Sequence, residues 1–149
     1  MKLSEKSFTK SEVFPCTIDI LWQRWTTHEG LKTFFGRDNK IDLKIGGAFE
    51  IYFLMDSPVG MRGSEGCKIL SYLPQKMLSF SWNTPPSFTL QRASGYYTWV
   101  VIFFEEKDEN SCNLTLTHYG WPEDEQWLPI YEYFFEAWDA VLQNLKASI

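Results

Sequence analysis

His118 is the polar residue best placed to do chemistry in this chain. Apolar and polar side chains alternate along residues 112–118, which is typical of a strand with one buried face. His118 lies on the same face as Leu114 and Leu116, so its side chain is expected to point inward. An inward imidazole at the end of a cavity could orient a ligand's carbonyl or hydroxyl group, or act as a general acid or base. The alternative is a structural histidine bonded to a neighbouring backbone group or tyrosine hydroxyl. The sequence favours this alternative, because it places no partner group for catalysis.

Large aromatic side chains form the second candidate site. They can bind a hydrophobic molecule by contact area and stacking, although they could equally pack on one another as a solid core. The predicted ligand-binding residues are Phe49, Phe53, Phe80, Trp82, Trp99, His118, Tyr131, Phe135 and Trp138. Residues 99–104 are apolar on both faces of their strand, so a partner or dimer surface is the alternative explanation for that segment.

Charged residues and potential metal ligands give weaker evidence for a functional site than His118 and the aromatic residues do. Arg62 and Arg92 lie in two loops predicted near the mouth of a cavity, where either could bind an acidic head group, although solvated loop charges are more common. His28 and Glu29 are rejected as a metal site, since adjacent helical residues diverge by about 100° and no further ligand is near in sequence. No nucleophile motif, phosphate-binding glycine loop or carboxylate pair is present. We therefore expect no metal and no cofactor, and a binding protein more than an enzyme.

Length and composition predict a single domain over residues 1–149. The 149 residues include 17% aromatics and three scattered cysteines, which predicts a large core with reduced thiols. A net charge of −5 disfavours nucleic acid and anionic lipid surfaces as partners. No segment approaches the roughly 20 apolar residues that cross a bilayer, and the first residues lack a signal core. We expect a cytoplasmic protein, either a monomer or a homodimer, with no membrane contact.

The elements that must position these residues follow from periodicity and turn signals. Helical spacing predicts two short helices after the first strand and a long helix from near residue 128, and alternation predicts strands between them. The predicted strands cover residues 7–14, 40–45, 49–55, 66–73, 77–82, 96–106 and 112–118. Residues 83–95 contain Pro85-Pro86 and are expected to form an irregular, mobile loop.

The terminal helix carries a broad aromatic face that must lie against the predicted sheet. Its apolar residues recur at spacings of three and four, opposite a charged face. They are Tyr131, Phe134, Phe135, Trp138, Val141, Leu142 and Leu145. A long helix gripped by a sheet often leaves a cavity between the two.

Four motifs occur in order along the chain and together carry a resemblance. They are Thr27-His28-Glu29-Gly30-Leu31 with Phe34-Phe35-Gly36, Asp42 to Phe49 around Gly46-Gly47, Leu78-Ser79-Phe80-Ser81-Trp82, and Leu114 to His118 followed by Gly120-Trp121. In type and spacing they resemble the AHSA-like family, the homologues of the activator of heat-shock-protein-ninety ATPase. This family belongs to the START-like or SRPBCC superfamily. Phe34 and Ala137 depart from the family, which usually has Trp and Gly at these positions, and the loop at residues 83–95 is longer than typical.

The resemblance implies an α+β helix-grip fold, in which a curved antiparallel sheet of about six or seven strands surrounds a long C-terminal helix. Such folds serve many functions, so three hypotheses follow. The first is a protein that holds a small hydrophobic or amphipathic molecule between sheet and helix. The second, implied by the family alone, is a co-chaperone-like module that interacts with a heat-shock-protein-ninety-type ATPase. The third is a cyclase-like or hydrolase-like enzyme that uses His118.

Overall fold

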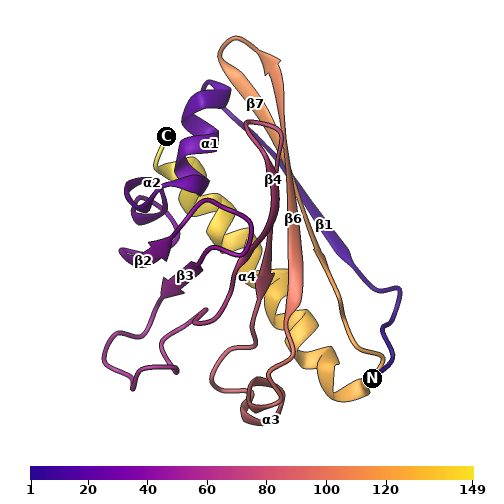
Figure 1. Ribbon diagram of the computed structural model, residues 1–149. Coiled ribbons are helices and arrows are strands. Elements are labelled where there is room, and N and C mark those ends of the chain that lie inside the picture. The colour runs from indigo at the N-terminus through magenta and orange to yellow at the C-terminus, as the bar shows by residue number, and fades with distance from the viewer.

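The computed structural model describes all residues, 1–149, as one α+β unit (Figure 1). The elements run β1 (Phe8–Phe14), α1 (Ile18–Thr26), α2 (His28–Lys32), β2 (Asp38–Ile41), β3 (Phe49–Tyr52), β4 (Ile69–Leu73), β5 (Met77–Trp82), α3 (Thr89–Ala93), β6 (Thr98–Asp108), β7 (Ser111–Tyr119), the 3-10 helix η1 (Glu125–Trp127) and α4 (Leu128–Ala147). The predicted helix-grip class is confirmed, with two short helices after the first strand and a long helix at the end.

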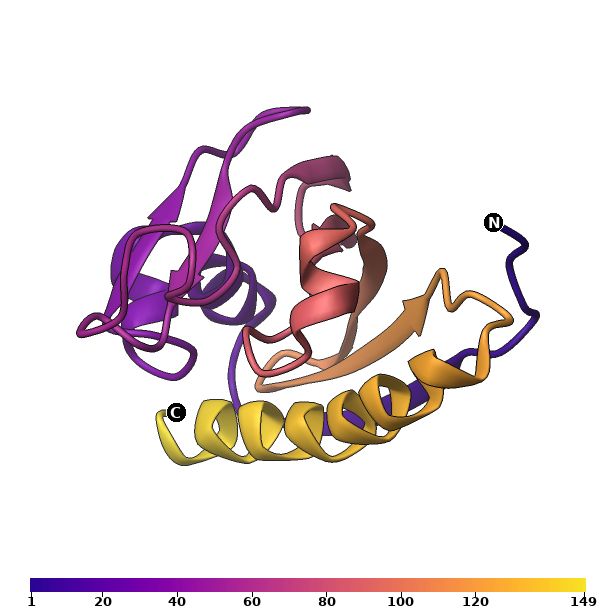
Figure 2. The same cartoon turned by 90° about the horizontal axis from the view of Figure 1, so that it is seen from below.

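The seven strands form two antiparallel sheets. The large sheet has the order β1-β7-β6-β5-β4, and β2 pairs with β3 in a small sheet. Alternation along β7 buries one side of the strand and leaves the other side half-buried or exposed. Figure 2 shows α4 running along the large sheet. In Figure 1, α1, α2 and the small sheet lie to one side of the large sheet. We call the side of the large sheet that meets α4 and α1 the inner face, and the opposite side the outer face.

The long helix α4 begins at Leu128, as predicted, with Pro129 in its first turn, where a missing N–H costs nothing. Its buried ridge is Ile130, Phe134, Trp138, Leu142 and Leu145. Two ion pairs tie its flank to β1: Lys10 Nζ lies 3.1 Å from Asp139 Oδ2, and Lys146 Nζ lies 2.6 Å from Glu12 Oε1. The helix is therefore fixed along most of its length.

The strand β3 is shorter than the predicted strand at residues 49–55. Pairing ends at Tyr52, because the backbone N–H groups of Phe53 and Leu54 both donate to the carbonyl of Arg62 and close a loop. Alternation still holds at Phe49, which is fully buried, but Phe53 is 52% exposed. The prediction that Phe53 continues a buried strand face is wrong for this reason.

Residues 83–95 are not wholly irregular, since they contain the short helix α3. The Arg92 guanidinium holds this segment by donating to the carbonyls of Thr84 and Gly60, at 2.6 Å each. It also pairs with Glu65 Oε1 at 3.3 Å, and both side chains are largely buried. The segment that the sequence marked as mobile is thus bonded to the loop after β3.

One core joins these elements. It contains 29 buried apolar residues drawn from both sheets and from α1, α2 and α4. None of the helices combines the length and apolar character that crossing a membrane would require.

Candidate ligand-binding cleft

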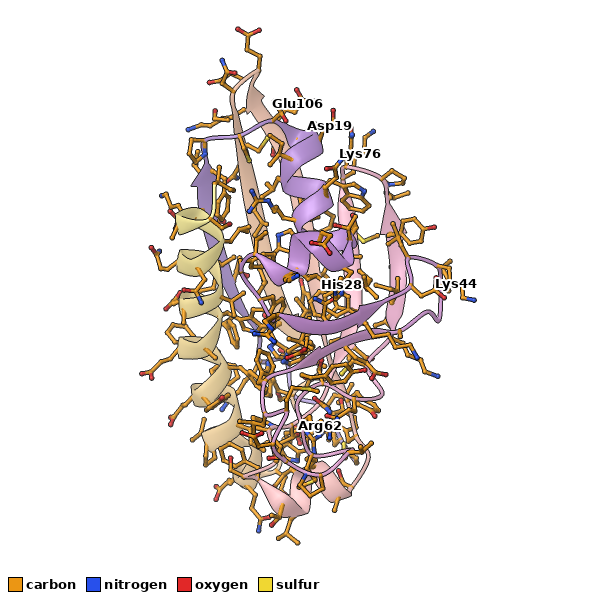
Figure 3. All side chains as sticks on the ribbon, turned by 90° about the vertical axis from the view of Figure 1, so that its left-hand side faces the viewer. Asp19, His28, Lys44, Arg62, Lys76 and Glu106 are labelled. Atoms are coloured by element: carbon orange, nitrogen blue, oxygen red, sulfur yellow. The ribbon has the colours of Figure 1, made fainter.

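A cleft of about 330 Å³ opens between α4 and the loops at one end of the large sheet. This volume is at the lower end of the 300–1,000 Å³ typical of small-molecule sites. The lining residues are Phe35, Phe53, Leu54, Arg62, Gly63, Ser64, Trp82, Asn83, Pro85, Pro86, Ser87, Tyr133, Phe134, Ala137, Trp138 and Val141. In Figure 3, Arg62 lies among the loops below the small sheet, at the level of the first turns of α4.

Three aromatic rings form the floor of the cleft. The Trp82 and Trp138 ring centroids are 5.5 Å apart, and the Phe35 centroid is 5.6 Å from each of them. Two of these contacts are tilted and the Phe35–Trp138 contact is edge-on, arrangements that are favourable for aromatic pairs and hold the rings in place. Ala137 lies beside this floor on α4. Because its side chain is a single methyl group, it leaves space above the rings.

The mouth of the cleft exposes apolar surface to water. Phe53, Leu54 and Tyr133 all line it, and they are 52%, 50% and 48% exposed. Covering such residues removes apolar area from water, which is favourable by about 25 cal/mol per Å². The mouth therefore favours a ligand with an apolar body.

Arg62 is the only charged residue that lines the cleft. Two of the neutral polar side chains there are committed: Asn83 Nδ2 donates to the carbonyls of Gly63 and Glu65, and Ser64 Oγ accepts from the N–H of Ile51. Arg62 Nε donates to the Ser57 carbonyl at 2.9 Å, which anchors the side chain. Its two terminal amino groups make no hydrogen bond or ion pair, so they are available to an acidic group.

His118 lies in the core and does not line the cleft. Its ring is fully buried, and Trp138 Nε1–H donates to its Nδ1 at 3.0 Å. The proton is therefore on Nε2, which donates to Thr98 Oγ1 at 2.7 Å, and that hydroxyl donates in turn to the Trp82 carbonyl at 3.2 Å. Burial lowers the pKa of His118 to about 3. The imidazole is neutral with both nitrogens satisfied, so its role is to fix the rings of the cleft floor.

The structure thus supports the structural alternative for His118 over the catalytic one. A general acid or base must reach the reacting group, and a fully buried imidazole that bonds only to Trp138 and Thr98 does not. His118 is instead a positioning residue for Trp138.

The predicted aromatic site is divided among three places. Phe53, Trp82 and Trp138 line the cleft. Phe49 and Phe80 are stacked on each other, with centroids 4.1 Å apart, in the fully buried core, and neither lines the cleft.

Three of the predicted ligand-binding residues lie away from the cleft. Trp99 is on the outer face, because its strand neighbour Thr98 is the residue that turns inward to bond His118. Tyr131 and Phe135 pack against Phe8 of β1, on the flank of α4 that faces away from the cleft. The prediction that these three form the inner surface with the others is wrong.

Arg92 likewise lies outside the cleft, although it was a candidate for its mouth. Its bonds to the Gly60 and Thr84 carbonyls and to Glu65 use the guanidinium for structure. The Glu65 carboxylate accepts from the N–H groups of Arg62 and Gly63, and these bonds outweigh burial and lower its pKa. The Glu65–Arg92 pair shapes the loop that carries Arg62.

Several lining residues were missed from the sequence. Tyr133, Ala137 and Val141 form a row at spacings of four, one position round the helix from the buried row of Phe134, Trp138 and Leu142. The unusual Ala137 was a signal for this row, and the proline pair at residues 85–86 was a signal for the opposite wall.

Comparison with known proteins gives the family. The family model for "Activator of Hsp90 ATPase homolog 1-like protein" matches residues 15–149. A protein from Mesorhizobium loti is similar in structure, with a TM-score of 0.75 and 16% identity over 96% of each chain. An HSP90 activator from Plasmodium falciparum has a TM-score of 0.72 and 19% identity, over 95% of this chain and 94% of that one. No curated protein matches in sequence. The chain belongs to the AHSA-like family of the SRPBCC helix-grip superfamily.

Proposed function

We propose that this protein binds a small amphipathic molecule in the cleft between α4 and the sheet. The observation that carries the proposal is an open, largely apolar cleft of about 330 Å³ whose only charged lining residue is Arg62. A rigid aromatic floor with one unpaired cation at its edge suits a ligand with an apolar body and an acidic head group. The helix-grip fold supports the proposal but does not by itself select a ligand.

The ligand's orientation follows from where the polar atoms lie. The floor of Phe35, Trp82 and Trp138 offers one neutral donor, the Trp82 indole N–H, because the Trp138 indole N–H is used by His118. A carboxylate placed there would exchange its hydration for one neutral hydrogen bond, whereas at Arg62 it would gain charge-assisted hydrogen bonds, which are stronger. The apolar body therefore lies on the floor, and the head group lies towards Arg62.

Titration with decanoate and its neutral counterpart decanol tests both parts of the proposal. Both should quench or shift the fluorescence of the floor tryptophans and raise the melting temperature. The variant Ala137→Leu fills the cleft and should abolish binding of both. The matched control is Ala140→Leu, which makes the same substitution at an exposed position of α4 and should bind like the unaltered protein. Equal binding by both variants, or none by the unaltered protein, would contradict the proposal.

The role of Arg62 is tested separately. Arg62→Gln should weaken decanoate about tenfold, because a charge-assisted hydrogen bond contributes about 1.5 kcal/mol, and leave decanol unchanged. Lys68→Gln is the control, since it removes the same charge from an exposed residue outside the cleft. If decanoate binding survives Arg62→Gln, the cleft binds by its apolar surface alone.

A second candidate function is docking on an Hsp90-type ATPase. It is favoured by the family and by the similarity to the Plasmodium falciparum HSP90 activator. In this case the chain should raise the ATPase rate of a purified Hsp90 and co-sediment with it. Failure of both assays at concentrations up to about 100 μM would reject the co-chaperone function without affecting the ligand proposal.

A further inference from the structure

A second cavity, of about 320 Å³, lies beside the cleft and is lined mostly by polar residues and glycines. We call it the polar cavity. Its walls come from α3, from the residues just before β6 and from the loop after β3, which lie at the same end of the molecule (Figure 1). Within that loop, residues 62–64 line the cleft, whereas Gly60, Met61 and Glu65 line the polar cavity. The loop therefore separates two spaces of different character.

The Glu65–Arg92 ion pair lies in the wall of the polar cavity and supplies its only charges. Arg92 Nη2 lies 3.3 Å from Glu65 Oε1, and the two side chains are only 10% and 17% exposed. At this distance the two charges largely cancel for any molecule in the cavity. An anion attracted by Arg92 would be repelled by Glu65, and a cation attracted by Glu65 would be repelled by Arg92. The pair therefore favours a neutral ligand.

Several lining side chains keep a polar atom that has no partner within the protein. The hydrogen bonds of Arg92 use its terminal nitrogens, so its Nε–H is free to donate. Asn83 binds through Nδ2 and leaves its Oδ1 free to accept. The hydroxyls of Thr89 and Tyr97 are also unpaired, and each can both donate and accept. This mixture matches a ligand with several hydroxyl groups, because each hydroxyl of the ligand likewise donates and accepts.

Tyr97 gives the polar cavity a flat apolar wall. The residue is 36% exposed, and its hydroxyl occupies the space that a Cβ at residue 66 would need, so Gly66 leaves room for the ring over the loop. Aromatic rings bind apolar faces by contact area. A sugar ring or cyclic polyol presents such a face of C–H groups, with hydroxyls at its rim. Its shape therefore suits a wall formed by Tyr97 with free polar atoms around it.

We propose that the polar cavity binds a neutral cyclic polyol such as a monosaccharide unit. The C–H face of the ring packs on Tyr97, and the rim hydroxyls bond to Arg92 Nε–H, Asn83 Oδ1 and the Thr89 hydroxyl. The volume of the cavity is at the lower end of the range for small-molecule sites, which fits one ring rather than a chain of rings. The site does not depend on the ligand of the cleft, because the two spaces share only Asn83 among their lining residues.

A titration followed by the Nε–H signal of Arg92 in two-dimensional NMR tests the proposal. The probes are methyl glucoside, methyl galactoside and myo-inositol, each raised to about 50 mM because a small polar ligand binds with millimolar affinity. At least one probe should shift the Arg92 Nε–H signal saturably and leave the indole N–H signals of Trp82 and Trp138 in place. Decanoate should do the reverse, so failure of this site and failure of the cleft proposal give different results.

Two variants assign the binding to the polar cavity. Tyr97→Ala removes the apolar wall and should weaken binding about tenfold or more. Thr89→Val removes one hydroxyl with little change in volume and should weaken binding about fivefold, as expected for one neutral hydrogen bond. The matched control is Tyr119→Ala, which removes a tyrosine of similar exposure, 38%, on β7 outside the cavity and should bind normally.

Circular dichroism and melting establish that each variant is folded, and Thr89→Val decides the outcome if Tyr97→Ala does not fold. Weaker binding by either variant, with normal binding by Tyr119→Ala, supports the proposal. The absence of a saturable shift with all three probes would overturn it, as would a shift that both variants leave unchanged or that Tyr119→Ala reduces equally. A response to acetate or methylguanidinium but to none of the polyols would mean that the ion pair opens to bind ions, which would also overturn it.

Discussion

His118 should make the folded protein lose stability between pH 7 and pH 5. The unfolded chain binds a proton at this residue near its ordinary pKa of 6.5, whereas burial lowers the folded pKa to about 3. Below pH 6.5 the unfolded state therefore holds one proton more than the folded state. Its free energy falls by about 1.4 kcal/mol per pH unit relative to the folded state. From pH 7 to pH 5 the loss at this residue is about 2 kcal/mol, and it continues towards pH 3.

Urea denaturation at pH 7, 6 and 5 measures this loss. The comparison is His118→Gln, whose amide can accept from Trp138 and donate to Thr98 without titrating. The pH dependence of its unfolding free energy should be about 2 kcal/mol smaller over this interval, whatever its stability at pH 7. The lowered pKa of Glu65 also destabilises the fold in acid, but it does so equally in both proteins. Equal pH dependence in the two proteins would refute the assignment of a buried, neutral imidazole.

Three further predictions concern the frame around the cleft. Gly30→Ala should cost more than about 3 kcal/mol of unfolding free energy, since an added Cβ would overlap the backbone oxygen of Gln23; a cost below about 1 kcal/mol would show that the helices do not pack this closely. Lys10→Met removes an ion pair and a cation–π contact with α4 and should lower the unfolding free energy by about 1 kcal/mol; an unchanged urea midpoint would reject these contacts. Arg92→Met should speed amide hydrogen exchange in residues 60–65 with little change in β6 and β7, whereas uniform acceleration would mean that Arg92 does not act locally.

The terminal helix shows which structural features can be predicted from helical spacing in the sequence. Spacing predicted its start and its buried row, because both follow from local turn chemistry and from the helical repeat. Periodicity did not separate the two flanks of that row. Tyr131 and Phe135 face β1, and Tyr133 and Ala137 face the cleft, and this difference depends on where β1 lies. The apolar face of the helix is wide, so only the tertiary neighbours decide which edge is free.

Trp99 shows a second limit. A strand that is apolar on both sides gives no alternation from which its inward face can be read. The assignment depends on a single polar contact, the bond of Thr98 to His118, which turns Thr98 inward and therefore Trp99 outward. His118 itself was correctly predicted to point inward. Its two partners, from β6 and α4, lie 20 residues away on either side in sequence and could not be paired with it beforehand.

The indole N–H signals of the seven tryptophans report whether a ligand binds in the cleft. In a two-dimensional NMR titration with decanoate, the signals of Trp82 and Trp138 should shift. Trp99 on the outer face should stay in place. The same titration of Ala137→Leu should leave all seven signals unmoved. Shifts centred on Trp99, or shifts at Trp82 and Trp138 that persist in Ala137→Leu, would show that decanoate does not bind in the cleft.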